Sequence, residues 1–289
     1  MDSYIEYLVA FSVNDPAGKG IAEALIDIAH CNKIDYIPII DLKAEALYLC
    51  KDLKSIIAGF NEDVLFFDFL ENVKDVKYFI ILSRHTSESG MPSLTTHVPG
   101  NPWGKNVAGG KPWEMPPANP ILMWYFLKEL NIQCDRHNMV EFKRSYEVTH
   151  HGPTSITRPI TFVEIGSSER EWRMVNAHRA VAFTVVEGIK KMLTNIYSSE
   201  PCIVSIGFGG THYAPLFTRR AIEYNECYGH IIPNYVIKEL GLEDIRSIAI
   251  KAINATPKVK RVVIEKMKSE VRKVIASIAK EQGLDVISY

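Results

Sequence analysis

The chain lacks several features that would place it in a specialised class of protein. Its 289 residues contain no run of eighteen or more apolar residues, so no segment is predicted to cross a membrane. The N-terminus has neither the basic start nor the long apolar centre of a signal peptide. The formal net charge is −1, which excludes a polycation that coats nucleic acid but leaves a local basic face open. We therefore expect a cytoplasmic protein with no membrane partner.

Cysteine is also scarce, and the cysteines do not form motifs. The odd total and the absence of any Cys-x-x-Cys pair argue against a disulfide framework and against a thiolate zinc finger. Any metal is then expected to be held by histidine and carboxylate. The five positions are Cys31, Cys50, Cys134, Cys202 and Cys227.

What the chain does contain is a regular alternation of strand-like and helix-like patterns, without an internal repeat. This alternation predicts an α/β fold with a mostly parallel or mixed sheet flanked by helices, and residues 1–289 are expected to form a single domain. Strands are predicted at 7–12, 35–40, 78–82, 141–148, 160–165, 202–206 and 230–232. Helices are predicted at 21–30, 120–130, 170–196, 234–240 and 257–283, with a helical or mixed segment before residue 70.

The turn after the first predicted strand, residues 14–20, has two glycines and a lysine. Its spacing matches neither of the glycine-rich phosphate-binding motifs. Asp15 as an N-cap and Pro16 in the first turn instead predict an ordinary strand-to-helix connection.

A long loop region, 83–120, follows the apolar strand at 78–82. Such a loop is uncommon inside a compact domain unless it is functional. Arg84 and His85 stand directly at the strand end, and His97 precedes a turn at Pro99-Gly100. Chemistry in open α/β folds is found where strands end in such loops.

Two later segments, 147–153 and 207–215, also combine histidine with glycine and proline. In the first, His150 and His151 are adjacent, so on extended backbone only one is expected to face a site, unless the chain turns at Gly152-Pro153. In the second, glycines lead to His212 and would let backbone N–H groups approach a substrate closely, although a tight turn explains them equally well.

Together the three segments predict a metal site. Histidines that converge with a carboxylate such as Glu147 are the usual non-thiolate ligands of zinc, and zinc with an open position activates water for hydrolysis. The remaining histidines are interpreted as structural: His30, His137, His178 and His230.

The predicted C-terminal helix, 257–283, is locally basic, and Lys260 and Lys268 belong to it. A solvated helix face is one interpretation. A face that contacts the phosphates of RNA is the other.

The three histidine segments, in this order, resemble the archaeal and plant type of D-aminoacyl-tRNA deacylase. The resemblance implies a zinc-dependent hydrolase that cleaves the ester between a D-amino acid, such as D-tyrosine, and the terminal ribose of tRNA. It implies one or two zinc ions, tRNA charged with a D-amino acid as the partner, and a monomer. It also implies a fold related to phosphorylase/hydrolase-like and peptidyl-tRNA hydrolase-like proteins.

Within this resemblance we assign roles to residues. His85, His97, His151 and His212 are expected to hold the metal, and His97, His151, His212 and Glu147 to carry catalysis. Substrate contacts are expected from Arg84, Gly209, Gly210, Thr211, Lys260 and Lys268. The alternatives are a metal-free peptidyl-tRNA-hydrolase-like enzyme or RNA-binding module, and a phosphorylase-type enzyme that binds phosphate.

Overall fold

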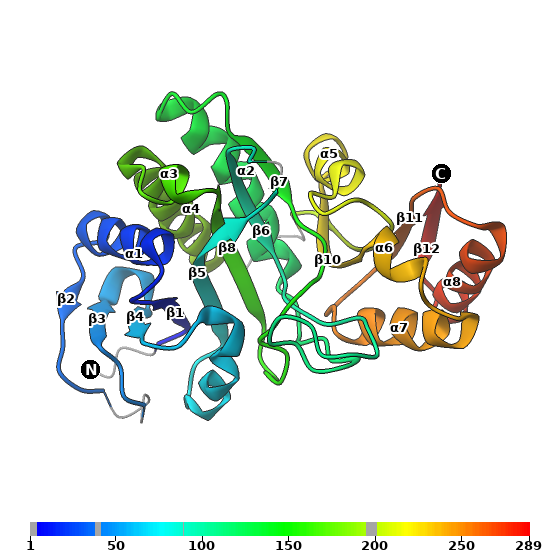
Figure 1. Cartoon of the computed structure of the whole chain (residues 1–289), viewed down its shortest axis with the longest axis horizontal. Coiled ribbons are helices and arrows are strands. Elements are labelled where there is room, and N and C mark those ends of the chain that lie inside the picture. Colours follow the sequence, from blue (N-terminus) through cyan, green and yellow to red (C-terminus); the bar gives the residue numbers. More distant parts are fainter. Residues whose placement is uncertain (1–4, 38–41, 89, 195–200) are drawn as a thin grey trace.

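Two β-sheets stand side by side along the long axis of the molecule (Figure 1). The structure is a computed structural model, and it describes residues 5–37, 42–88, 90–194 and 201–289. In this part of the chain, the larger sheet has eight strands in the order β2-β3-β4-β1-β5-β8-β6-β7. The smaller sheet has four, in the order β10-β9-β11-β12. No helix in these ranges is long and apolar enough to span a bilayer.

The larger sheet is mixed, as the sequence predicts. Its centre, β4-β1-β5-β8, is parallel, whereas β6 runs antiparallel to β8 and β3 antiparallel to β4. The strands are β1 (Tyr7–Ser12), β2 (Asn32–Lys33), β3 (Ala46–Cys50), β4 (Ser55–Phe60), β5 (Tyr78–Thr86), β6 (Ser93–His97), β7 (Lys143–Tyr146) and β8 (Ile160–Ser167). The short 3₁₀ segment η1 (Lys51–Leu53) joins β3 to β4.

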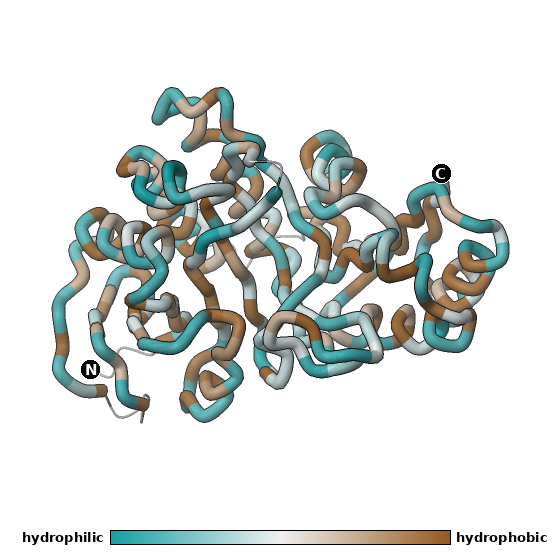
Figure 2. The backbone as a smooth tube through the Cα atoms, viewed as in Figure 1, coloured by the Kyte–Doolittle hydropathy of each residue, from teal (hydrophilic) through white to brown (hydrophobic). Residues whose placement is uncertain are grey.

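The central strands are apolar along their length because both faces of the sheet are covered. Helices α1 (Pro16–Ile28) and α4 (Val175–Thr194) pack on one face, and the 3₁₀ segment η2 (Val64–Asn72) packs on the other. The backbone coloured by hydropathy shows apolar residues gathered along these strands (Figure 2). The predicted first strand and the Asp15 cap are confirmed, since the Asp15 carboxylate accepts from the N–H groups of Ala17 and Gly18.

Helix α2 (Pro120–Arg136) contributes to two hydrophobic cores, which explains why its sequence is apolar nearly all round. Leu122 and Phe126 pack under the larger sheet, whereas Met123 and Leu127 pack against the smaller one. Because this one helix is shared, we propose that the two sheets form a single domain.

The smaller sheet is parallel throughout. Its strands are β9 (Ile203–Phe208), β10 (Glu226–Ile232), β11 (Arg261–Ile264) and β12 (Asp285–Ser288). Helix α5 (Pro215–Glu223) packs on one face, and α7 (Leu242–Asn254) and α8 (Ser269–Glu281) pack on the other. The one-turn helix α6 (Asn234–Ile237) follows β10.

The predicted basic helix at 257–283 is wrong. This range holds strand β11 and helix α8 instead, and α7 precedes them. The apolar residues that suggested a helical stripe lie partly in the strand, where consecutive Val262, Val263 and Ile264 are all buried because both faces of the sheet are covered. As a result Lys260 and Lys268 lie at opposite ends of β11.

Other boundaries also differ from the prediction. The segment before residue 70 contains strands β3 and β4, and the 83–120 region contains the end of β5 and all of β6. The predicted helix at 170–196 is divided into α3 (Glu169–Trp172) and α4. The predicted strand at 35–40 is wrong for residues 35–37, which are not in a strand, and its remainder lies outside the described residues, as do the last residues of the 170–196 helix.

The expectation against disulfides is wrong as well. Cys31 bonds to Cys50 and Cys202 to Cys227, and only Cys134 is free among the described cysteines. Strand pairing explains both bonds: Ile203 pairs with Glu226, and Asn32 with Leu49, so cysteines distant in sequence become neighbours.

Candidate metal and active site

Five histidines and two glutamates meet where β5, β6, β8 and β9 and the segment after β7 approach one another. His85 ends β5, His97 ends β6, and His212 follows β9. The carboxylates are those of Glu147 and Glu164, whose residues are 1% and 3% exposed. His150 and His151 complete the set.

Strand register brings Glu164 to this place. Ser83 of β5 and Thr95 of β6 lie directly beside it on the two neighbouring strands. Residues two positions further along a strand share the same face, so His85 and His97 project beside the Glu164 carboxylate. The Ser83 hydroxyl donates to Glu164 Oε1 at 2.5 Å, which fixes the other oxygen toward the histidines.

The same alternation turns Arg84 away from the histidines. Its backbone N–H donates to Asp15 Oδ2 at 2.8 Å, its guanidinium lies 3.7 Å from Asp63, and its Cζ is 5.6 Å from the centre of the Trp172 ring. Arg84 therefore reaches the rim of the pocket from the α1 side, and it is not part of the cluster itself.

His150 and His151 both reach the site because the backbone turns between them. His151 has a φ of 49°, a left-handed conformation that breaks the up-and-down alternation of an extended chain. The Nδ1 of His150 donates to the Val148 carbonyl at 2.7 Å, and the Nδ1 of His151 to that of Gly152 at 2.6 Å. With these tautomers the Nε2 lone pair of each ring is available to a metal.

The glycine turn after β9 positions His212. Gly209 and Gly210 have φ values of 123° and 87°, which favour glycine, and the N–H of Gly210 donates to the Glu265 carboxylate. The His212 carbonyl accepts from Val148 N–H at 3.0 Å, so the two later histidine segments are tied together.

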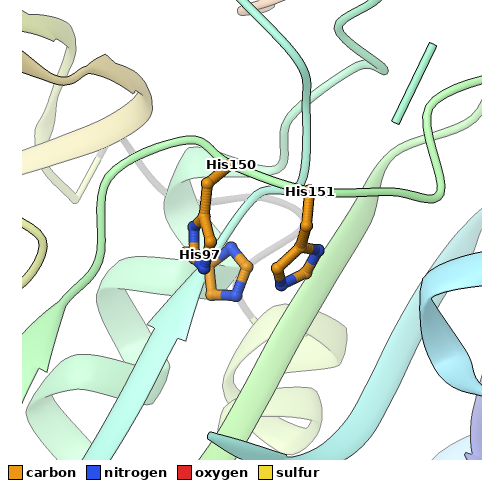
Figure 3. Close-up of side chains that lie close together, drawn as sticks. All are labelled: His97, His150 and His151. Carbon is orange, nitrogen blue, oxygen red and sulfur yellow. The ribbon is translucent and has the colours of Figure 1, made fainter. Parts of the chain in front are cut away.

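The seven side chains form three groups of possible metal ligands, and the third, His97 with Glu147 and Glu164, shares a residue with each of the other two. In the first, nitrogens of His97, His150 and His151 all lie within 4.8 Å of one another, and Figure 3 shows the three rings converging. In the second, His85 Nδ1 is 3.3 Å from Glu147 Oε1, and His212 Nε2 is 3.0 Å from Glu147 Oε2.

The donor set fits a metal ion better than it fits an internal hydrogen-bond network. Among the described residues, the Nε2 atoms of His97 and His212 and both carboxylate oxygens of Glu147 are buried without a hydrogen bond of acceptable geometry. Buried polar atoms are rarely left so. Two ligands of a tetrahedral zinc lie about 3.3 Å apart, and the second group has that spacing. Imidazole and carboxylate suit zinc.

Protonation also favours metal binding. Burial lowers the pKa of His97 to about 4, and burial with repulsion from its neighbours lowers the pKa of His150, so both rings are neutral near pH 7. Burial alone would raise the pKa of Glu147, but contact with His212 and the charge of His85 hold it well below its usual value. Burial and the charge of Glu147 raise the pKa of Glu164.

The cluster opens into a pocket of about 410 Å³. Its polar wall consists of Ser83, Glu164, His85, His150, His151 and His212, while Val64 and Leu65 contribute an apolar one. This size is within the range of about 300–1,000 Å³ for small-ligand sites.

The structure thus brings together His85, His97, His151, His212 and Glu147. It adds two residues that the sequence analysis missed, Glu164 and His150. A lone acid inside the apolar strand 160–165 was an available signal for Glu164. His150 was set aside because the alternation rule assumes extended backbone.

None of the other predicted substrate residues belongs to the histidine–glutamate cluster. Gly209, Gly210 and Thr211 lie in the turn behind His212 and do not line the pocket. Lys268 lies at the carboxyl end of β11, the same edge of the small sheet as His212, whereas Lys260 lies at the amino end. His230, interpreted as structural, is buried and bonded to Thr149 and to the Pro116 carbonyl.

Fold and site together define an α/β protein with a buried histidine–carboxylate centre of the kind that binds catalytic metals. A family model described as D-aminoacyl-tRNA deacylase matches residues 72–287, and the chain belongs to this family.

Two curated relatives carry the same name. A D-aminoacyl-tRNA deacylase from Staphylothermus marinus is 35% identical over 98% of this chain and 99% of its own. One from Desulfurococcus amylolyticus is 37% identical over 80% of each chain. A crystal structure described as a conserved protein of unknown function has a TM-score of 0.84 at 29% identity, and covers 98% of this chain and 95% of that one.

The pKa of His97 predicts how the metal-free protein responds to acid. An exposed imidazole has a pKa of about 6.5, so between pH 6.5 and pH 4 the unfolded chain binds a proton that the folded chain does not. Stability therefore falls as the pH drops through this window. The measurement is the free energy of unfolding of chelator-treated protein, obtained by urea unfolding at pH 7 and at pH 4.5. We expect this free energy to fall by about 2 kcal/mol less in His97→Gln than in wild type.

The exposed His30 gives the matched control. The free energy of unfolding of His30→Gln should fall between pH 7 and pH 4.5 by as much as that of wild type. Equal declines for wild type and His97→Gln would contradict the prediction.

Proposed function

We propose that the protein hydrolyses the ester bond of D-aminoacyl-tRNA and releases the free D-amino acid and tRNA. The observation that carries the proposal is the buried histidine–glutamate centre at the base of a pocket, in a chain that belongs to the deacylase family over most of its length. Removal of D-amino acids from mischarged tRNA would be a quality-control step in translation.

We further propose that the centre holds zinc, with His85, His97, His150, His151, His212 and Glu147 as ligands for one or two ions. Bound zinc supplies Lewis-acid chemistry, since it polarises a carbonyl and lowers the pKa of water to about 7. The neutral imidazoles of His97 and His150, together with an ionised Glu147, support this assignment.

Residues of the protein other than the proposed ligands have separate roles in the reaction. Glu164 has a raised pKa, and its Oε2 faces the histidines, so it is suited to accept a proton from the attacking water and return it to the leaving ribose oxygen. Ser83 orients that carboxylate. Tyr213, whose hydroxyl is 3.2 Å from His85 Nε2, orients the His85 ring.

The rival functions differ in what they require. A metal-free hydrolase needs one histidine held as a general base by hydrogen bonds, but Nε2 of His97 and of His212 have none in the described structure. A phosphorylase-type enzyme needs free N–H groups in the glycine turn. Here the N–H of Gly210 is bonded to Glu265 and that of Gly209 to the Ile232 carbonyl.

The expectations of a monomer and of a cytoplasmic location stay predictions.

The proposed function is tested by charging tRNA with D-tyrosine or L-tyrosine and following release of each amino acid. We expect the zinc-loaded protein to release D-tyrosine at least about tenfold faster than L-tyrosine. Equal rates, or no release of either, would exclude a deacylase that discriminates by chirality.

The metal assignment predicts the behaviour of two variants. His151→Ala and His212→Ala should each bind less zinc, measured by elemental analysis, and lose about 10²-fold or more in kcat, with unchanged circular dichroism. His137→Ala is the control, because its ring bonds to the Gln133 carbonyl at the C-terminal end of α2 and is not part of the cluster. Full activity in chelator, or full activity of either variant, would contradict the assignment.

Lys268 is proposed to contact a tRNA phosphate. It lines a second pocket of about 620 Å³ with Lys238 and Lys266, on the same sheet edge as His212, and no ion pair of these three lysines exists within the described residues. We expect Lys268→Glu to raise KM severalfold at low salt, with the effect shrinking as salt is added.

Lys260→Glu gives the same charge change on the far edge of the sheet and should have the smaller effect. A rise in KM that does not depend on salt, or a larger rise for Lys260→Glu, would remove Lys268 from the tRNA interface.

A further inference from the structure

An aromatic pair lines the same pocket as the histidine cluster. Trp103 comes from the loop after β6, and Tyr235 comes from α6, which follows strand β10 of the smaller sheet. Their ring centres are 5.6 Å apart, so the rings touch, although they are far apart in sequence. Neither residue has a part in the proposed hydrolysis.

The loop that carries Trp103 is closed around one buried side chain. Asn101 is 1% exposed, and its amide donates to the carbonyls of Lys105 and Gly110 at 2.7 and 2.9 Å. Its carbonyl oxygen accepts from the Trp103 N–H at 3.1 Å. The position of Trp103 is therefore fixed by the protein before any ligand binds.

The same loop is bonded to the histidine segment. The N–H of Gly152 donates to the Ala108 carbonyl at 2.9 Å, and the N–H of Gly100 donates to the His151 carbonyl at 2.9 Å. These bonds set the distance between the aromatic pair and the metal-binding side chains. A ligand that touches both is held in one orientation.

The pair lies on the solvent side of the pocket. Tyr235 is 38% exposed, and the Lys105 ammonium, which lies 3.9 Å from the exposed Glu239 carboxylate, stands 4.6 Å from the centre of the Trp103 ring. A partly exposed aromatic pair beside a cation is typical of sites where a nucleobase stacks and a phosphate lies nearby.

We propose that Trp103 and Tyr235 form the stacking surface for the adenine of the 3′-terminal adenosine of tRNA. This inference rests on the proposed function, because the ester to be cleaved is on the ribose of that adenosine. The adenine is attached to that same ribose, so it must lie close to the histidines when the ester is bound there. The base is the same in every tRNA, whereas the amino acid varies, so contacts to the base can orient any substrate.

The alternative occupant is the side chain of the amino acid. It is less favoured because the pair stands on the solvent side, from which the tRNA arrives. The polar wall with Ser83 and Glu164 is instead suited to surround the reacting carbonyl.

The test uses uncharged tRNA with its complete end and the same tRNA lacking only the terminal adenosine. We expect wild type to bind the complete tRNA at least about fivefold more tightly than the shortened tRNA, measured by fluorescence anisotropy. Trp103→Ala and Tyr235→Ala should lose most of this preference, and Trp103→Phe should keep most of it. Tyr36→Ala, which changes an aromatic residue that is 70% exposed, is the control and should match wild type.

Kinetics separate the two occupants. With zinc-loaded protein, the alanine variants should raise KM by the same factor for D-tyrosyl-tRNA and D-alanyl-tRNA. A rise for D-tyrosyl-tRNA alone would assign the pair to the amino acid side chain and overturn the proposal, as would equal binding of both tRNA ends by wild type. The binding experiment needs no hydrolysis, so it tests the stacking surface independently of the proposed function. If only the proposed function failed, wild type would still prefer the complete tRNA but would not release D-tyrosine from charged tRNA.

Discussion

The burial of two carboxylates, Glu147 and Glu164, is the constraint on which this site depends. A buried negative charge is costly unless positive or hydrogen-bonding partners surround it. Here the partners are imidazoles that come from the ends of β5 and β6, from the segment after β7 and from the turn after β9. No single segment of the chain can supply them, so the centre exists only when both sheets are assembled. Helix α2 and the hydrogen bond from the Val148 N–H to the His212 carbonyl hold the sheets in that arrangement.

The pocket above this centre has walls of different chemistry. Its floor is polar and carries the groups that can bind metal and move a proton. Other parts of its wall carry Arg84 with Asp15 and Asp63, and the aromatic pair of Trp103 and Tyr235. A charged, ordered substrate end would meet all three. This division matches the demands of an aminoacyl ester, in which the carbonyl, the amino group and the nucleoside require different contacts.

The candidate site could be predicted in part because histidine is rare and its neighbours are informative. The segments around His85, His151 and His212 each follow a predicted strand, and open α/β folds carry their chemistry where strands end in loops. Glu164 could not be placed in the same way, because only the register of β5, β8 and β6 decides that it faces His85 and His97. His150 depends on one backbone angle at His151, which no periodic pattern encodes.

By itself, the sequence determined the features that depend on local interactions. These include the first strand, the Asp15 cap with its helix, the buried character of α2 and the mixed α/β class. Only the tertiary structure decided the identity of 257–283 as strand and helix, the two disulfides, and the face to which Arg84 turns. Local periodicity fixes which side chains share a face of one element, whereas pairing between distant strands fixes which elements meet, and that pairing is a property of the whole chain.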